Sequence, residues 1–163
     1  GDISKLKFKN KYFDYILAFG LYHNLKDNLD EAIIETNRVL KRGGYICASF
    51  RADNVQNKIN DYLYEKKNKE KLFFHKMNFT KKEFANMFVK HGFAIEKIYP
   101  VENMPFLYKF SFFRSKKQKK FNENIARIQG YHLSTFGKIL QKILIIFFPN
   151  QFCNIYVLIG KKV

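Results

Sequence analysis

The chain has 163 residues, with 30 Lys and Arg against 14 Asp and Glu, which gives a formal net charge of +16. Hydrophobic residues make up 47% of the chain, enough for a packed core, so composition excludes a wholly disordered protein and predicts one domain or part of one. Two cysteines exclude a disulfide framework and a cysteine-rich zinc site. The apolar stretches are too short for an ordinary transmembrane helix, and the start of the chain does not read as a signal peptide, so we expect a cytoplasmic protein. The abundance of Lys, Asn, Ile and Phe is typical of A/T-rich coding sequence, so the charge alone does not indicate a nucleic-acid-binding protein.

The first elements predict a strand, a helix and a second strand. Residues 13–20 form an apolar run that ends in glycine, as expected of a strand buried on both faces. Asn28 followed by Glu31 has the spacing of a helix N-terminal capping box, and Gly43 is the expected glycine after the helix. A second apolar strand covers residues 44–50. A crossover helix between two strands predicts that these strands are parallel and joined in the right-handed sense.

The middle of the chain predicts two further helices and a strand. Residues 53–71 are polar with weak amphipathic spacing, which indicates a surface helix. Thr80 and Glu83 form a second capping box, and Phe79 and Phe84 occupy the positions of a hydrophobic staple. This helix is expected to end at Gly92, before a half-exposed strand over residues 93–99.

Residues 100–152 are rich in aromatic and basic side chains. We call residues 104–121 the aromatic-basic segment, because aromatics are dense over 104–113 and only positive charges occur over 109–120. Short helices are expected over about 119–128 and from Ser134 to Pro149. The apolar stripe of the second helix, from Phe136 to Phe147, is expected to pack in a core rather than to anchor the protein to a membrane. A final apolar strand covers residues 154–160.

Several motifs together resemble one enzyme family. They are Gly1-Asp2, the strand start Phe13-Asp14-Tyr15-Ile16, His23, Glu35, and the run Arg38-Val39-Leu40-Lys41-Arg42-Gly43-Gly44-Tyr45-Ile46. In order and spacing these pieces resemble the C-terminal half of a class I S-adenosylmethionine-dependent methyltransferase of the methyltransferase-11 type. Arg42 departs from the proline that is usual in this motif.

The resemblance implies an α/β fold, the C-terminal half of a Rossmann-like methyltransferase sheet. Residues 1–99 and 153–163 would form the sheet core, and residues 100–152 a helical lid or substrate-cap insertion before the last strand. That strand should run antiparallel beside residues 93–99. The family's glycine-rich loop and the acidic residue of its second strand have no counterpart here. The resemblance therefore implies that an N-terminal half of the same domain precedes Gly1 and that this fragment is inactive alone.

The resemblance also implies roles for individual residues. Asp2 would accept a hydrogen bond from the adenine amino group of S-adenosylmethionine, and the cofactor would also contact Ile3, Ala18, Phe19 and Gly20. His23 would act as a general base or orient a substrate hydroxyl, although a structural role is open to it. Tyr22 would line the substrate pocket, as would Phe106 and Tyr108 from the lid. No spacing typical of a metal site occurs, and methyl transfer requires none.

The function implied is transfer of a methyl group to an O or N nucleophile of a small molecule, including a lipid-linked or surface-sugar precursor. The aromatic-basic segment leaves other interpretations open. It would serve as a lid over the substrate, contact an anionic membrane, bind nucleic acid, or form a packed helix with a solvated lysine face. The alternative function is therefore a non-catalytic basic module that binds anionic membrane or RNA, and a location at the membrane periphery is consistent with either.

Overall fold

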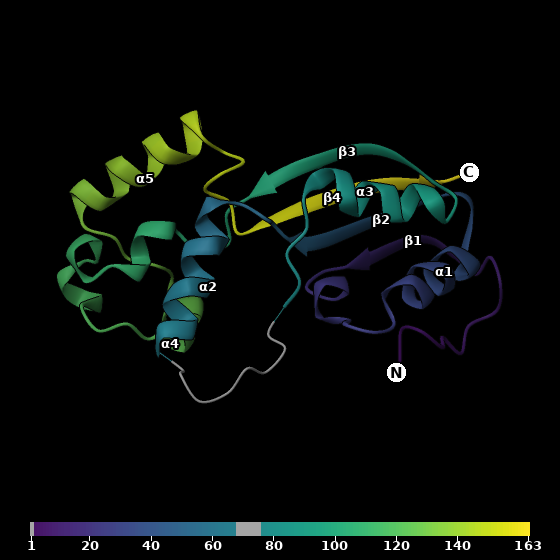
Figure 1. Cartoon of the computed structure of the whole chain (residues 1–163), viewed down its shortest axis with the longest axis horizontal. Coiled ribbons are helices and arrows are strands. Elements are labelled where there is room, and N and C mark those ends of the chain that lie inside the picture. Colours follow the sequence, from purple (N-terminus) through teal and green to yellow (C-terminus); the bar gives the residue numbers. More distant parts are fainter. Residues whose placement is uncertain (1, 68–75) are drawn as a thin grey trace.

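The computed structural model describes residues 2–67 and 76–163 of the chain (Figure 1). Its strands are β1 (Phe13–Ala18), β2 (Leu40–Arg51), β3 (Phe93–Val101) and β4 (Ile155–Lys162). Its α-helices are α1 (Leu29–Val39), α2 (Val55–Lys67), α3 (Lys81–Lys90), α4 (Glu123–Gln129) and α5 (Thr135–Phe147). Four short 3-10 turns complete the described elements: η1 (Tyr22–Asn24), η2 (Phe106–Lys109), η3 (Ser111–Phe113) and η4 (Lys116–Gln118).

The strands form one sheet in the order β1-β2-β4-β3. β1 and β2 are parallel, with Ala18 opposite Ala48, as the crossover helix requires. β4 runs antiparallel to both of its neighbours and places Leu158 between Ala48 of β2 and Ile98 of β3. The expected α/β fold with an antiparallel last strand beside residues 93–99 is therefore confirmed.

The junction of α1 and β2 differs from the expectation. α1 ends at Val39 and β2 begins at once at Leu40, so Gly43 lies within the strand instead of capping the helix. Gly43 has a φ of +76°, a left-handed conformation that glycine adopts without strain, and it coincides with an irregular register between β1 and β2. A Cβ on Gly44 would lie 2.8 Å from the carbonyl oxygen of Asp14. The two glycines therefore permit a bulged, close pairing of β2 with β1.

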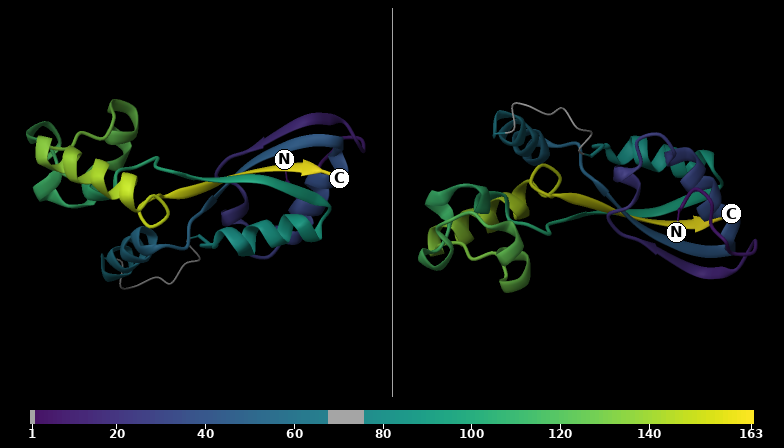
Figure 2. Two further views of the ribbon diagram at one scale, coloured as in Figure 1. Left: turned by 90° about the horizontal axis from the view of Figure 1, so that it is seen from above. Right: turned by 90° about the horizontal axis from the view of Figure 1, so that it is seen from below.

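Helices α1 and α3 cover one face of the sheet, as Figure 2 shows. The core on this face joins Ile33 of α1 and Phe84 and Phe88 of α3 to alternate residues of β2, including Ile46 and Phe50. The ring centroids of Phe50 and Phe84 are 3.9 Å apart in a stacked arrangement. Burial of these large side chains is the main source of stability for the sheet part.

The opposite face of the sheet is not covered by any element in the described ranges (Figure 2). Tyr15 and Leu17 of β1 are 71% and 72% exposed, and Tyr45 and Cys47 of β2 are only partly buried. The outer edge of β1 also has no neighbouring strand among the described residues. Parallel strands of α/β proteins are usually covered on both faces, so this sheet exposes an apolar surface of the kind that normally receives further helices.

Residues 102–152 form a second, helical part with its own core. Phe106, Leu107 and Tyr108 pack there with Ala126 and Leu133. The expected helix over 119–128 begins later, at Glu123, with the Asn122 side chain accepting a hydrogen bond from the backbone N–H of Ile125. The second expected helix is confirmed as α5, capped by the Ser134 side chain. The helix expected over 53–71 is described as far as Lys67, and the rest of that range lies outside the described residues.

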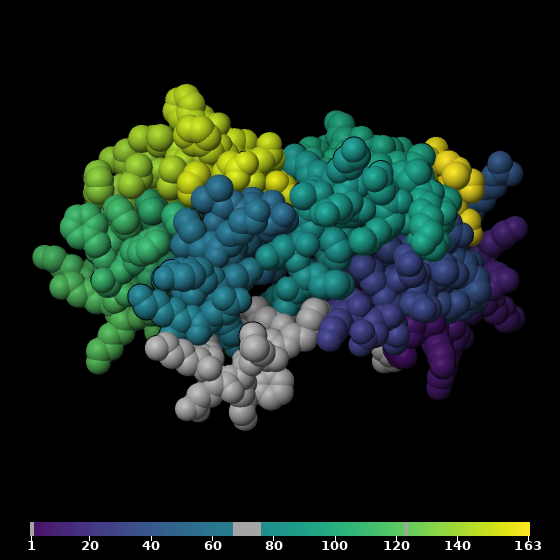
Figure 3. Space-filling model, viewed as in Figure 1, coloured from purple at the N-terminus to yellow at the C-terminus, as the bar shows by residue number. Residues whose placement is uncertain are grey.

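Asparagine side chains fasten α2 between the two parts. Asn57 donates hydrogen bonds from its side chain to the carbonyl oxygens of Ala52 and Asn154, at 2.7 and 2.8 Å. The Asn154 side chain in turn accepts hydrogen bonds from the backbone N–H groups of Asn103 and Met104. In Figure 3, α2 (blue) accordingly lies between the helical part (green) and the sheet part (teal and purple).

Candidate functional site

The largest described cavity is a cleft at the carboxyl ends of the parallel strands. It has a volume of about 870 Å³, and we call it the main cleft. Its walls come from the ends of β1, β2 and β3, from α2, from the start of β4 and from the helical part. Its lining residues are Phe19, Gly20, His23, Asn24, Ser49, Arg51, Asn57, Asn60, Asp61, Tyr64, Lys76, Asn103, Met104, Lys109, Arg127, Tyr131, Asn154 and Ile155. Open α/β sheets bind their ligands at this edge, so the main cleft is the candidate site.

The end of β1 forms one wall of the main cleft. Phe19 is 60% exposed, and Gly20 has a φ of +69° with no atom within 4 Å of the position of a Cβ. The backbone N–H of Gly20 donates a 2.8 Å hydrogen bond to the Ser49 hydroxyl at the end of β2, which joins the two strand ends. Ala18 is buried beneath them. The sequence analysis predicted Phe19 and Gly20 as cofactor contacts, and the structure places both in the lining of the main cleft.

His23 lies in the turn that follows β1 and lines the main cleft. Its side chain is only 5% exposed, and its Nδ1 atom is buried with no hydrogen-bond partner among the described residues. Burial, aided by the positive charges of Lys76 and Arg51, lowers the pKa of His23 from 6.5 to about 4. The imidazole is therefore neutral at neutral pH, and its Nδ1 atom is left without a hydrogen-bond partner among the described residues, in a residue that lines the cleft.

A charged network forms the opposite wall. The guanidinium of Arg51, at the end of β2, makes two parallel hydrogen bonds to the carboxylate of Asp61 on α2, at 2.9 and 2.6 Å. The side-chain amide of Asn78 donates a further hydrogen bond to Asp61 at 2.9 Å. Paired Arg–carboxylate geometry is rigid and specific, so this network fixes α2 against the sheet. Next to it, Asn60 presents a buried side-chain oxygen with no partner among the described residues.

Asp2 and Ile3 lie outside the lining of the main cleft. The Asp2 carboxylate accepts hydrogen bonds from the backbone and hydroxyl of Ser4, at 2.9 and 2.7 Å, and these bonds lower the pKa of Asp2. Ile3 packs against the core of the sheet part. The adenine contacts that the resemblance implies for these two residues therefore stay predictions.

Three residues expected to contact substrate lie outside the lining of both described cavities. Tyr22 is fully buried, its hydroxyl lies 2.8 Å from that of Thr36, and its ring packs edge-on against Phe88. Phe106 and Tyr108 belong to the core of the helical part and are 7% and 1% exposed. The side chains of all three are needed for packing, which removes them from the lining of either described cavity.

Several lining residues were missed by sequence reasoning. Ser49 and Arg51 end β2, and their position after an apolar strand is a signal that could have identified them. The contributions of α2 and the helical part, such as Asn60 and Tyr131, could not have been found in this way. They reach the cleft only through tertiary packing between segments far apart in the sequence.

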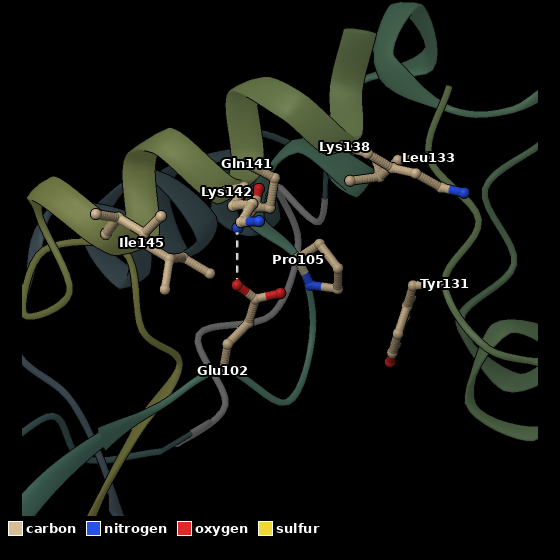
Figure 4. A pocket seen from close by; sticks show the side chains of 9 residues that line it. Glu102, Pro105, Tyr131, Leu133, Lys138, Gln141, Lys142 and Ile145 are labelled. Atoms are coloured by element: carbon tan, nitrogen blue, oxygen red, sulfur yellow. Dashed lines mark hydrogen bonds between the residues drawn. The ribbon is translucent and has the colours of Figure 1, made fainter. Parts of the chain in front are cut away.

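A second, smaller cavity lies in the helical part. It has a volume of about 330 Å³ and is lined by Glu102, Pro105, Tyr131, Leu133, Lys138, Gln141, Lys142, Ile145 and Ile146 (Figure 4). The Gln141 side chain donates a 3.0 Å hydrogen bond to the Glu102 carboxylate, and burial raises the pKa of Glu102. We call this cavity the α5 pocket.

Within residues 2–67 and 76–163, no group of three or more His, Cys, Asp or Glu side chains is arranged to hold a metal ion.

The described sheet and helices have the Rossmann-like α/β fold of class I methyltransferases. Residues 1–48 match the family model described as Methyltransferase domain, which confirms the resemblance seen in the sequence. No curated protein matches the chain.

Solved structures of methyltransferases share this fold. One is an S-adenosylmethionine-dependent methyltransferase of Thermotoga maritima, described as a possible histamine N-methyltransferase, with a TM-score of 0.55 and 18% identity over 100% of this chain and 62% of that chain. Another, from Methanosarcina mazei, has a TM-score of 0.59 and 17% identity over 100% of this chain and 65% of that chain. A third, from Archaeoglobus fulgidus, has a TM-score of 0.53 and 18% identity over 94% of this chain and 61% of that chain. The chain thus spans less than two thirds of the length of each.

The family and these neighbours imply S-adenosylmethionine as the cofactor. The described residues fit part of it. The open space at Gly20 suits a bound group at the end of β1. Gly43-Gly44, the one adjacent glycine pair in the sequence, is held in the β1–β2 pairing, so it does not supply a glycine-rich loop for the cofactor's methionine end.

Proposed function

We propose that this chain is part of an enzyme that transfers a methyl group from S-adenosylmethionine to an O or N nucleophile of a small molecule bound in the main cleft. The family match of residues 1–48 supports the reaction class, and the cleft at the carboxyl ends of β1 and β2 supports the location. The bound cofactor supplies an electrophilic methyl group. The protein then has to hold the acceptor in line with it and manage the acceptor's proton.

The unpartnered Nδ1 of His23 is the observation that carries this proposal. A neutral imidazole accepts a hydrogen bond from an acceptor hydroxyl or amine, and this bond would orient the nucleophile within the cleft. With a pKa of about 4, His23 is a weak base, so its main contribution would be orientation and not storage of the proton. Gly20 leaves space beside it, and Phe19 would pack against the bound groups.

The polar character of the main cleft supports a hydroxyl-rich acceptor, such as a surface-sugar precursor, free or lipid-linked. Amide side chains are the commonest polar groups in its lining, and the Asn60 oxygen lacks a partner among the described residues. Amides both donate and accept hydrogen bonds, which suits them to sugar hydroxyls. Tyr131, which lines both cavities, adds an aromatic surface against which a sugar ring can pack.

We also propose that a further part of the same domain is the partner of the uncovered sheet face. Tyr15 and Leu17 are largely exposed there, and the outer edge of β1 offers unpaired backbone groups to another strand. Each of the solved methyltransferases compared above is longer than the part that this chain matches. An N-terminal half with its own strands and helices would cover both the face and the edge, and would bring the glycine-rich loop that this chain lacks.

The rival function, a basic module without catalysis, predicts binding of RNA or anionic membrane without any affinity for the cofactor.

The test is calorimetry of S-adenosylmethionine binding to the full-length protein, followed by transfer of labelled methyl groups from the cofactor to candidate sugar and amine acceptors. His23→Gln is expected to keep cofactor binding and lower methyl transfer by about 100-fold. His132→Gln, at an exposed histidine of the helical part, is the matched control and should leave transfer unchanged. Absence of cofactor binding by the full-length protein would refute the proposal.

A further inference from the structure

Helix α5 carries an apolar stripe on its outward side. Five of its large hydrophobic residues are between 44% and 70% exposed, namely Phe136, Ile139, Ile143, Ile146 and Phe147, and we call them the α5 apolar face. They recur at the spacing of one side of a helix, which makes the stripe continuous. The expectation that the stripe from Phe136 to Phe147 packs in a core is therefore wrong for these residues. Only Leu140 and Leu144 of the stripe pack against the core of the helical part.

The orientation of α5 is fixed by its other side. Gln141 is 5% exposed and accepts a hydrogen bond from the backbone N–H of Leu107 at 3.0 Å. A Cβ on Gly137 would lie 2.6 Å from the carbonyl oxygen of Phe113, so the helix backbone is in direct contact with η3. These contacts are specific, and turning the α5 apolar face inward would break them. The exposure of the face is thus a property of the fold.

The apolar surface continues beyond the helix. Phe112 is 77% exposed and its ring centroid lies 6.3 Å from that of Phe136, while Phe148 is 54% exposed at the other end. Contiguous exposed apolar surface of this kind is unusual on a monomer and marks an interaction site. None of the helices in the described ranges is long and apolar enough to cross a membrane, so the surface suits a partner that is met from one side.

Positive charge surrounds this surface. Lys138 and Lys142 are exposed on α5 beside the α5 apolar face, and the four lysines at 116, 117, 119 and 120 are exposed in the neighbouring aromatic-basic segment. Beyond Glu102 the sequence holds one acidic residue, Glu123, against eleven Lys and Arg. A surface that combines exposed Phe and Ile with flanking lysines matches an anionic lipid headgroup layer above hydrocarbon. A second copy of the same chain fits less well, because two molecules of charge +16 repel each other.

We propose that the α5 apolar face docks on an anionic phospholipid bilayer, with the helix parallel to the membrane plane. Phe136, Ile146 and Phe147 would enter the boundary between headgroups and acyl chains. Lys138 and Lys142 would contact the headgroup phosphates. This inference does not depend on the proposed methyl transfer, because no residue of the main cleft takes part in it.

The α5 pocket supports this orientation. Lys138 and Lys142 line it (Figure 4). Ile146, which belongs to the α5 apolar face, lines it as well. The pocket therefore opens beside the apolar face, and its two lysines reach the same surface of the molecule. A bilayer in contact with the face would bring headgroup phosphates next to both lysines.

The test is co-sedimentation of the full chain with phosphatidylcholine vesicles, with and without phosphatidylglycerol. Ile139→Gln with Ile146→Gln is expected to reduce binding to anionic vesicles at least about tenfold, since it removes two exposed apolar side chains from the contact. The matched control is Ile34→Gln with Val89→Gln, at apolar positions of α1 and α3 that are 49% and 55% exposed. Because all four positions are exposed, neither variant should impair folding, and circular dichroism checks this.

A second pair of variants isolates the electrostatic contribution. Lys138→Gln with Lys142→Gln should lower binding to anionic vesicles about tenfold without affecting the weak binding to neutral vesicles. Lys7→Gln with Lys9→Gln removes the same charge from exposed positions near the start of the chain and is the control. High salt should weaken binding of the unchanged protein and should have less effect on the variant at 138 and 142.

Tryptophan fluorescence then reports the position of the helix. The chain contains no Trp, so Phe147→Trp introduces a single emitter, whose emission should shift to shorter wavelength when anionic vesicles are added. Tyr62→Trp, at a 62% exposed position of α2, should show no shift. Equal vesicle binding by the α5 and control variants, or an unshifted Phe147→Trp emission, would overturn the proposal. A different result would assign the face to a second copy of the chain. In that case the unchanged protein would form dimers and would not bind vesicles, and Ile139→Gln with Ile146→Gln would dissociate the dimers.

Discussion

His23 links the main cleft to the pH dependence of folding. Its pKa is about 4 in the folded protein and 6.5 when exposed, so between these values the unfolded chain binds a proton that the folded protein does not. Its contribution to the free energy of unfolding is therefore full above about pH 6.5 and is lost as the pH falls toward 4. The loss amounts to about 3 kcal/mol at most for a shift of this size. We expect urea unfolding to show a decline in stability from pH 7 to pH 4.5.

His23→Gln should flatten this pH dependence, because glutamine does not titrate in this range. His132→Gln, which changes an exposed histidine, should leave it in place. An unchanged slope in His23→Gln would show that other groups dominate acid destabilisation.

Arg38 explains why the sequence motif around it is informative. Its guanidinium makes two hydrogen bonds to Glu35, both at 2.8 Å, and donates others to the carbonyl oxygens of Leu6 and Phe8. It also bonds the Asn10 side chain at 2.7 Å. One side chain thus holds the segment before β1 against α1, and a lysine could not reproduce the planar, multiple bonding. The motif residue acts on structure and lies away from the main cleft.

At the scale of elements, the two predicted capping boxes behave differently. The Thr80 side chain accepts a hydrogen bond from the backbone N–H of Glu83, and the Glu83 carboxylate accepts one from the backbone N–H of Thr80 at 2.8 Å. Asn28 precedes α1 but makes no capping hydrogen bond with its side chain. Thr80→Ala should therefore lower the free energy of unfolding by about 1 kcal/mol, whereas Asn28→Ala should change it much less. Thermal or chemical unfolding of both variants measures the difference, and equal losses would contradict it.

Much of the fold could be predicted from local patterns. The apolar run at 13–20 and the alternating pattern at 93–99 located strands, and the spacing of Thr80 and Glu83 located the start of α3. The extension of β2 back to Leu40 could not be predicted, because it depends on how Gly43 and Gly44 meet β1. A glycine after a helix normally indicates its end, and the same residue serves equally well in a bulged strand.

The helical part shows a second limit of prediction from sequence patterns. Helical spacing identifies an apolar stripe but does not say what it faces, so Phe136 and Leu140 looked equivalent although one is exposed and the other packs inward. The same holds for the candidate site. Phe19 and Gly20 could be placed because they follow a strand, whereas Asn60 on α2 reaches the main cleft only through contacts over long sequence separations.

At the scale of the whole molecule, the uncovered sheet face and the partial cofactor site have the same origin in our proposal. The 163-residue chain by itself is expected to bind S-adenosylmethionine weakly or not at all, because it lacks a glycine-rich loop for the methionine end of the cofactor. Calorimetry on this chain and on the full-length protein makes the comparison. Micromolar binding by the 163 residues alone would contradict the idea that a further part of the domain completes the site.

The central position of β4 affects how the sheet forms during synthesis of the protein. β4 follows β1, β2 and β3 along the described residues, yet it lies between β2 and β3 and pairs with both. While the chain emerges from the ribosome, β2 and β3 have no partner between them until Ile155–Lys162 has been released. The sheet therefore closes only after β4 has been synthesised, and until then β2 and β3 each expose an unpaired strand edge. We expect a chain truncated before Ile155 to leave these edges open and to be degraded faster than the whole chain, which pulse-chase labelling would measure.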